Sequence, residues 1–163
     1  MTRDPISTSS KPRRVRFKVG DIFAVPLGLS FGYCRYLDHL VTEFFDLLSQ
    51  DQLPIENILK AHIAFVVWVS KEPFASGAWP KIGNSLTRPK PSPVFYKQDP
   101  ISKRLYLYQD GREKPATLAD CQGLENAAIW RENHIEDRLS DHFSGRPNKW
   151  VELLKPKHFR GVL

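Results

Sequence analysis

Short runs of Val, Ile, Phe, Tyr and Trp, each bounded by Gly, Pro, Asp or Ser, dominate the chain from Val15 to about residue 115. Runs of this length and composition are typical of β-strands. They predict strands over Val15–Val19, Asp21–Val25, Phe31–Leu37, Val41–Leu48, Ile63–Val69 and Arg104–Tyr108. About six strands at this spacing predict a strongly curved antiparallel sheet or a partly open β-barrel.

Three connections interrupt this pattern. Asp110-Gly111 predicts a tight hairpin turn, because both residues tolerate the positive φ that a type I′ turn requires. Residues 49–60 predict a loop that continues as a short helix beginning at Pro54. Proline occupies alternate positions in residues 85–93, which excludes a central strand and predicts an exposed, extended loop.

The apolar spacing changes from two to 3.6 residues after Pro115, as expected where strands give way to helices. A first helix begins at Thr117, where Asp120 completes a capping box; its apolar stripe is Leu118, Cys121, Leu124 and Ala128. A second helix begins near Asn133 and ends at Gly145; its stripe is Ile135, Leu139 and Phe143. A short helix or strand follows over Trp150–Leu154.

These elements predict an α+β protein with an N-terminal sheet and two or three C-terminal helices. The 163 residues suit one domain. We expect it over residues 15–155, between a disordered basic arm (residues 1–14) and a basic tail (residues 156–163). Since no apolar run approaches the ~18 residues that span a bilayer, and no secretory signal begins the chain, we expect a cytoplasmic protein without a membrane segment.

The net charge of +6 is concentrated at the two ends of the chain. Residues 1–20 carry +5 and residues 146–163 carry +4, which leaves −3 for residues 21–145. A core that reads DNA gathers its Lys and Arg on one structured face. The charge distribution therefore argues against nucleic acid as the partner.

Motifs for catalysis, phosphate binding and metal binding are missing from the sequence. His134 and His142 share a helical face with Arg138 between them, and an arginine in that position repels a cation. We therefore predict salt bridges there, with no metal site, no catalytic residues, no cofactor and no enzymatic activity. Cys34 and Cys121 lack metal-ligand spacing and predict two buried thiols, with a disulfide as the alternative.

Acidic side chains gather in two stretches of the body of the chain. The first, from Tyr36 to Ile58, contains five acids and no Lys or Arg. Complementary charge speeds association with a basic partner and rejects wrong partners. We predict a partner-binding surface that contains Asp38, Glu43, Asp46, Asp51, Glu56, Glu132, Glu136, Asp137 and Asp141. An ordinary solvated surface is the alternative interpretation.

Short motifs also run in unbroken order from about residue 16 to residue 155. Those of the N-terminal half are Lys18-Val-Gly-Asp-Ile-Phe-Ala-Val-Pro-Leu27, Phe31-Gly-Tyr-Cys-Arg35, Phe44-Phe-Asp46, Phe65-Val-Val-Trp-Val69, Gly77-Ala-Trp79 and Ile82-Gly83. Those of the C-terminal half are Lys97-Gln-Asp-Pro100, Pro115-Ala-Thr117, Gly123-Leu-Glu125, Ala128-Ile-Trp130, His134-Ile-Glu-Asp-Arg138 and Arg146-Pro-Asn-Lys-Trp-Val-Glu152. The ordered set resembles the immunity protein 26 family.

The resemblance implies an antidote that binds a cognate bacterial toxin, a protein domain, and occludes its active site. A nuclease would suit the acidic body, because nuclease clefts are basic. The glycines of the motifs, Gly20 and Gly32, suggest close backbone approach, and Trp68, Trp79 and Trp150 are expected to anchor the core. The alternative is a nucleic-acid-binding small β-barrel or a barrel-type ribonuclease toxin, since Val-Gly-Asp-Ile near the start of a β domain also occurs there.

Overall fold

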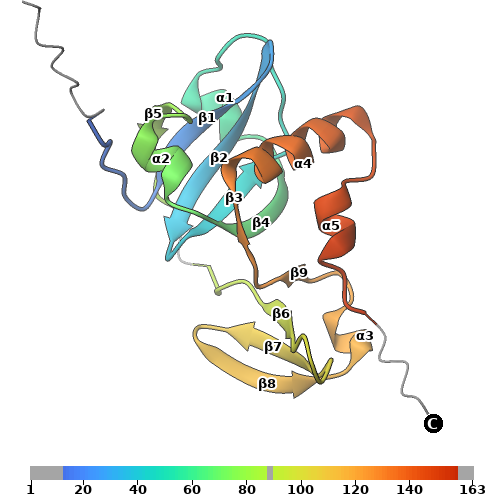
Figure 1. The fold of residues 1–163 in the computed structure, drawn as a ribbon. Helices are drawn as coiled ribbons and strands as arrows, with labels where there is room; N and C mark the ends of the chain where they lie inside the picture. Colours follow the sequence, from blue (N-terminus) through green and yellow to red (C-terminus); the bar gives the residue numbers. More distant parts are fainter. Residues whose placement is uncertain (1–12, 88–89, 158–163) are drawn as a thin grey trace, which may run out of the picture.

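Two β-sheets and five helices make up the part of the chain that the structure describes (Figure 1). This computed structural model describes residues 13–87 and 90–157. Most of the arm expected over residues 1–14 and of the tail expected over residues 156–163 therefore lies outside the described residues. The α+β class is confirmed, but the strands are divided between two sheets.

The large sheet has the strand order β10-β4-β3-β2-β1-β5. Its neighbours run antiparallel except β10, which pairs in parallel with β4. The outer strands β5 and β10 do not pair with each other, so the described residues form no closed barrel. The strands are β1 (Asp21–Leu27), β2 (Ser30–Asp38), β3 (Val41–Phe45), β4 (Ile63–Val69), β5 (Lys81–Asn84) and β10 (Ile129–Trp130).

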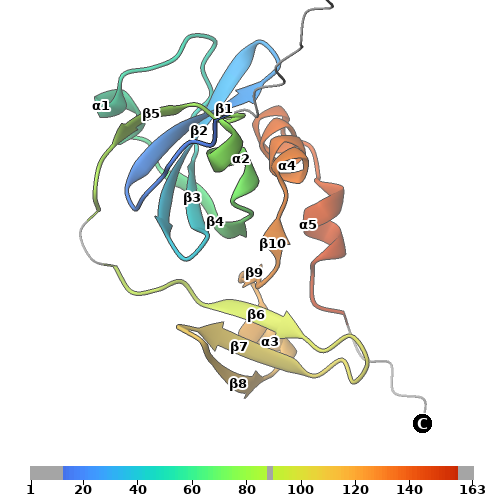
Figure 2. The same cartoon turned by 60° about the vertical axis from the view of Figure 1, so that its left-hand side comes forward.

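The small sheet lies below the large one in Figures 1 and 2 and has the order β8-β7-β6-β9. Its strands are β6 (Phe95–Gln98), β7 (Leu105–Gln109), β8 (Arg112–Ala116) and β9 (Glu125–Asn126). β9 pairs in parallel with β6, and β10 follows it directly into the large sheet. One short segment therefore belongs to both sheets.

Helices cover both faces of the large sheet. The five helices are α1 (Ile55–Ile58), α2 (Glu72–Ser76), α3 (Leu118–Cys121), α4 (Glu132–Ser144) and α5 (Lys149–Leu153), of which α3 lies beside the small sheet (Figure 1). On one face, α2 and α4 bury a core with Phe23, Phe44, Phe74 and Leu139. On the other face, α1 buries a smaller cluster of Ala24, Tyr33, Phe45 and Ile58. The alternation of Phe23 and Ala24 between the clusters follows from the two-residue period of β1.

Three of the four tryptophans contribute to the apolar interior, and the fourth lines an open cleft. Trp79 is completely buried, as predicted, and Trp130 is buried without having been predicted. Trp150 is partly buried at the margin of the same core. Trp68 is partly exposed in a cleft between the sheets. The predicted thiols Cys34 and Cys121 are both buried and unbridged, and burial raises the pKa of each.

The strand predicted over Val15–Val19 is wrong. Among the described residues this segment has no strand partner; its Val15 amide donates to the carbonyl oxygen of Ala75, at the end of α2. The Phe17 ring packs on Tyr36 and Phe74. Only Phe17 of this extended segment packs on the core, whereas Val15 and Val19 are exposed. The other predicted strands correspond to β1, β2, β3, β4 and β7, although β3 ends at Phe45.

The first predicted C-terminal helix is much shorter than its apolar stripe. The capping box of Thr117 and Asp120 is confirmed, but α3 ends at Cys121, and Gly123 adopts a left-handed φ of 75°. Leu124 and Ala128 instead flank the strand β9. α4 is confirmed: it begins at Glu132, next to the predicted Asn133, and ends at Gly145 as its left-handed cap, although its N-cap residue is Arg131. The last element is a helix, α5, capped by Asn148.

Candidate partner-binding surface

A cleft of about 740 Å³ opens between the large and the small sheet. One wall is the turn between β2 and β3, and the opposite wall is the turn between β7 and β8. Aromatic and aliphatic side chains line much of the space between them. The lining includes Asp38, His39, Leu40, Val41, Trp68, Lys90, Phe95, Tyr108, Asp110, Gly111 and Ile129. A hollow of this size with apolar walls and a few polar groups is typical of a binding site.

The β2–β3 turn is built from two residues that seldom adopt its conformation. His39 has a φ of 44° and Leu40 a φ of 70°, and neither is glycine. Left-handed backbone at such a residue costs about 1 to 2 kcal/mol. Three hydrogen bonds offset this cost: the His39 amide donates to Asp38 Oδ1 (2.9 Å), the Leu40 amide to Tyr36 Oη (3.3 Å), and the Val69 amide to the Leu40 carbonyl oxygen (3.0 Å).

The opposite turn is the predicted Asp110-Gly111 hairpin. Both residues have positive φ, 50° and 76°, which confirms the turn type. Trp68 on β4 lies between the two turns, with its ring 5.2 Å from that of Phe95 and 5.3 Å from that of Tyr108. These aromatic contacts join the large sheet to the small one beneath the cleft.

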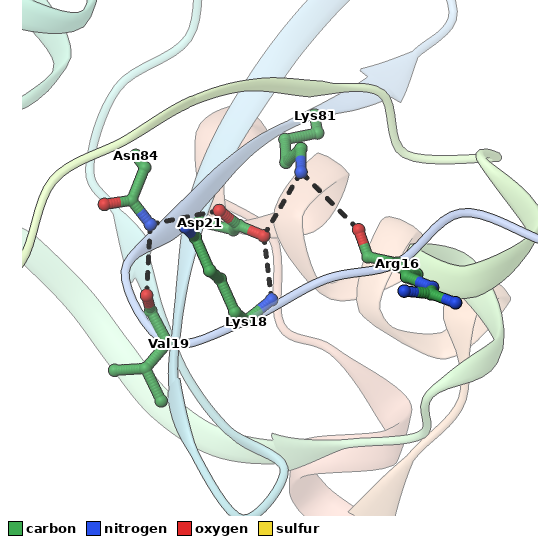
Figure 3. A network of polar contacts seen from close by, with 6 residues as sticks. All are labelled: Arg16, Lys18, Val19, Asp21, Lys81 and Asn84. Atoms are coloured by element: carbon green, nitrogen blue, oxygen red, sulfur yellow. Dashed lines mark hydrogen bonds and ion pairs between the residues drawn. The ribbon is translucent and has the colours of Figure 1, made fainter.

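A buried carboxylate fixes the rim of the cleft at Val19 and Gly20 (Figure 3). Asp21 is 1% exposed and accepts hydrogen bonds from the Lys18 amide (2.8 Å) and Asn84 Nδ2 (3.0 Å), while Lys81 Nζ lies 3.6 Å away. Gly20 has a φ of 87°, and a Cβ there would lie 2.9 Å from Leu86 Cδ2. The Lys-Val-Gly-Asp motif is therefore a structural turn, and the close approach predicted at Gly20 is confirmed.

The nine acids predicted to bind a partner do not form one surface. Asp38 lies in the cleft wall. Asp51 and Glu56 are exposed around α1. Asp46 accepts from His142 of α4 at 2.8 Å. At the start of α5, Asp137 accepts a hydrogen bond from Trp150, and Asp141 accepts one from Asn148. The last two acids, Glu132 and Glu136, face α2.

Glu43 differs from the other eight because it is buried. Its side chain is 3% exposed, and Arg35 Nη2 lies 2.5 Å from its Oε1. Lys90 Nζ lies 3.9 Å from Oε2. The carboxylate of Glu43 is therefore already neutralised inside the sheet, where it fixes Arg35.

A second acidic region, here called the α2–α4 acidic face, consists of Glu72, Glu132 and Glu136. Burial, followed by the charges of Glu136 and Glu72, raises the pKa of Glu132. Glu136 also accepts a hydrogen bond from Trp79 Nε1 at 3.0 Å, which fixes its position. Glu72 was not predicted, because only the fold brings α2 beside the start of α4.

The small sheet and its flanking residues also carry positive charge. Residues 90–116 contain six Lys or Arg against three Asp or Glu. Although residues 21–145 have a net negative charge, this part of the body is therefore locally basic. These cations do not share one face, since Lys97 lies beside Glu113 at 2.7 Å while Arg112 and Lys114 alternate with Glu113 along β8.

The salt bridges predicted for the α4 stripe are confirmed at Arg138 and His142. Arg138 forms a two-pronged pair with Glu125 of β9, at 2.6 and 3.1 Å. His142 contacts Asp46. Within residues 13–87 and 90–157, no three His, Cys, Asp or Glu side chains are grouped to hold a metal ion. None of the helices in that part of the chain is long and apolar enough to span a membrane.

Comparison with known proteins places the chain in a family. The family model for immunity protein 26 matches residues 18–107, which is more than half of the 163 residues. No curated protein and no solved structure matched the chain. The matched residues extend from the Lys18 turn through β1 to β7 and contain the β2–β3 turn, Trp68 and the buried Arg35–Glu43 pair. The chain belongs to the immunity protein 26 family.

Proposed function

We propose that this protein is the antidote of a bacterial polymorphic toxin system and neutralises its cognate toxin by binding it and covering its active site. Family membership supports the role of antidote. The α2–α4 acidic face supports binding to a basic partner. No catalytic step is part of this proposal.

The observation that carries the antidote role is the match of residues 18–107 to the immunity protein 26 family, and the raised pKa of Glu132 adds an electrostatic reason to place the interface at the α2–α4 acidic face. Burial, and then the charges of Glu136 and Glu72, disfavour the ionised form of Glu132, while Glu72 itself is paired with Arg14 at 3.2 Å. Titratable groups perturbed in this way cluster at functional sites, although structural networks also produce them. A cationic partner would relieve the repulsion, so part of the binding free energy would come from charge that is unfavourable in the unbound protein.

A nuclease is the toxin class that this charge favours. Nucleases hold phosphates in basic clefts, and a cluster of carboxylates can occupy the same cleft as the phosphates do. Association between such surfaces is fast at low salt and slows as salt screens the charges. We therefore expect the association rate to fall with ionic strength.

The test is a matched pair of double variants, assayed with the toxin domain encoded beside this gene. Glu132→Gln with Glu136→Gln removes two charges from the α2–α4 acidic face. Glu113→Gln with Glu152→Gln removes two exposed charges elsewhere, each paired with a lysine. The amide oxygen that Glu136→Gln introduces can still accept the hydrogen bond from Trp79, so folding should be preserved.

We expect the first variant to weaken the complex about tenfold or more and to reduce protection of cells that express the toxin. The control should stay within about twofold. Equal affinity of the two variants would exclude the α2–α4 acidic face as the interface. Failure of the wild-type chain to bind or protect would refute the antidote role itself.

The positive charge of the small sheet favours a second candidate function, binding to nucleic acid. Lys114→Glu with Arg112→Glu, in a chain shortened to residues 13–157, tests it on heparin and on single-stranded RNA. Binding by the shortened chain that these substitutions abolish would support this function. We expect only weak retention, because the cations lie on different faces of the sheet.

A further inference from the structure

The cleft between the two sheets is separate from the α2–α4 acidic face. We infer that it receives an arginine side chain carried on a protruding loop of the toxin. This inference rests on the proposed function, since it specifies how the antidote recognises its partner. The volume of the cleft, about 740 Å³, lies in the usual range for ligand sites, roughly 300 to 1,000 Å³.

The aromatic lining favours a planar cation. Trp68 is partly exposed in the cleft, and the rings of Phe95 and Tyr108 hold it in place. A guanidinium is planar and weakly hydrated, so it stacks on an indole with little loss of hydration. An ammonium is more strongly hydrated, which makes lysine the poorer occupant.

Carboxylates on both walls favour a positive charge. The Asp38 side chain is 65% exposed, and His39 at 3.4 Å is its salt-bridge partner among the described residues. Asp110 at the opposite turn has no Lys or Arg within 4.0 Å in the described part of the chain. Lys90 also lines the cleft and contributes one positive charge, since the Glu43 carboxylate 3.9 Å from its Nζ is already paired with Arg35. Among the described residues that line the cleft, Asp38 and Asp110 outweigh Lys90, so their net charge is negative.

The same protein already binds one arginine in this manner. The Arg138 guanidinium lies 3.7 Å from the centre of the Phe65 ring and 5.0 Å from that of Trp130. Glu125 accepts two of its hydrogen bonds. Aromatic faces and a carboxylate thus hold a guanidinium between the two sheets, and the cleft offers the same two kinds of group to a guanidinium from outside.

Nuclear magnetic resonance of the full chain tests this without the toxin. The probe is acetyl-Gly-Arg-Gly-amide, compared with the uncharged citrulline peptide and with the lysine peptide. The signal followed is the indole N–H of Trp68, assigned with Trp68→Phe. The indole of Trp150 on α5 serves as an internal control, since α5 does not line the cleft.

We expect a saturable shift of the Trp68 indole with millimolar affinity for the arginine peptide. The citrulline peptide should bind at least about fivefold more weakly, and Asp38→Asn or Asp110→Asn should each cost about three- to fivefold. Equal binding of the citrulline peptide would show an uncharged ligand site and overturn the inference. Absence of a shift at Trp68, or shifts at Trp150 alone, would overturn it as well.

Binding to the toxin domain separates this inference from the proposed function. We expect Asp38→Asn with Asp110→Asn to weaken that complex about tenfold. A full-strength complex with this variant would overturn the cleft inference and leave the antidote role intact. If the wild-type chain does not bind the toxin domain at all, the antidote role fails, and with it the toxin as the source of the arginine.

Discussion

Arg35 and Glu43 are direct register partners across strands β2 and β3, and they form an ion pair inside the large sheet. Arg35 Nε donates to Glu43 Oε1 at 2.7 Å, and Arg35 Nη1 donates to the carbonyl oxygen of Ser85 at 3.2 Å. The pair therefore joins two central strands and holds the segment that leaves β5. Removal of one member would leave the other as a buried, unpaired charge.

Glu43→Gln should lower the free energy of unfolding by about 3 kcal/mol, since Arg35 would lose its counter-charge in a buried position. Urea unfolding measures this effect. The double variant Arg35→Met with Glu43→Leu should recover most of the loss. Asp38→Asn, on the surface, is the control and should change stability by less than about 0.5 kcal/mol. If Glu43→Gln lowers the free energy of unfolding only slightly, the Arg35–Glu43 pair is solvated.

Asp21→Ala should destabilise the protein by about 2 to 4 kcal/mol, because the Lys18 amide and Asn84 lose a buried acceptor. Hydrogen exchange at the Lys18 amide should accelerate together with the loss in urea stability. Asn84→Ala removes one donor to Asp21 and should cost only about 1 kcal/mol. If the two variants lose equal stability, Asp21 is not the centre of the network in Figure 3.

Glu132→Gln should raise the melting temperature by about 1 to 2 °C at pH 7. Burial, then the charges of Glu136 and Glu72, raises the pKa of Glu132. The folded state thus binds the proton of the Glu132 carboxyl more tightly than the unfolded chain does. The stability that this proton contributes is fully present at low pH and is lost as the pH rises through the raised pKa. At about pH 4, where the unfolded chain also protonates, the variant and the wild type should melt together. A difference that persists there would contradict this account.

Arg138→Lys should lower the free energy of unfolding by about 1 to 3 kcal/mol even though the charge is kept. A lysine cannot form the two-pronged pair with Glu125 or stack as a plane on Phe65. Calorimetry measures the loss, with the exposed Arg146→Lys as the control, which should be almost neutral. Equal melting temperatures would show that charge alone holds α4 to β9.

The strands with continuous apolar character were predictable from the sequence, and so were one hairpin turn and two of the helix caps. β1 to β4 and β7, the Asp110-Gly111 turn, the capping box of α3 and the Gly145 cap all depend on local chemistry that the sequence displays. The short strands β9 and β10 were not predictable. Each has two residues, and each forms only because a distant strand offers its edge.

The candidate site was less predictable because its parts come together only through long-range contacts. Asp38 was recognised from its acidic neighbourhood, but the cleft also needs Trp68 from β4 and Asp110 from another sheet. Glu43 shows the opposite difficulty. In the sequence it resembles its exposed acidic neighbours, and only the pairing of β2 with β3 places it opposite Arg35 in the interior.

Because β9 and β10 add the last edge strands to the two sheets, the order in which the ribosome synthesises the chain affects folding. β4 precedes its partner β10 by about sixty residues, so during synthesis one edge of the large sheet stays unpaired until most of the polypeptide has emerged. Bare strand edges recruit other chains. Nascent copies should therefore be most prone to aggregate just before Ile129 and Trp130 leave the ribosome. A fragment that stops at residue 107, where the family match ends, would keep that hazard permanently.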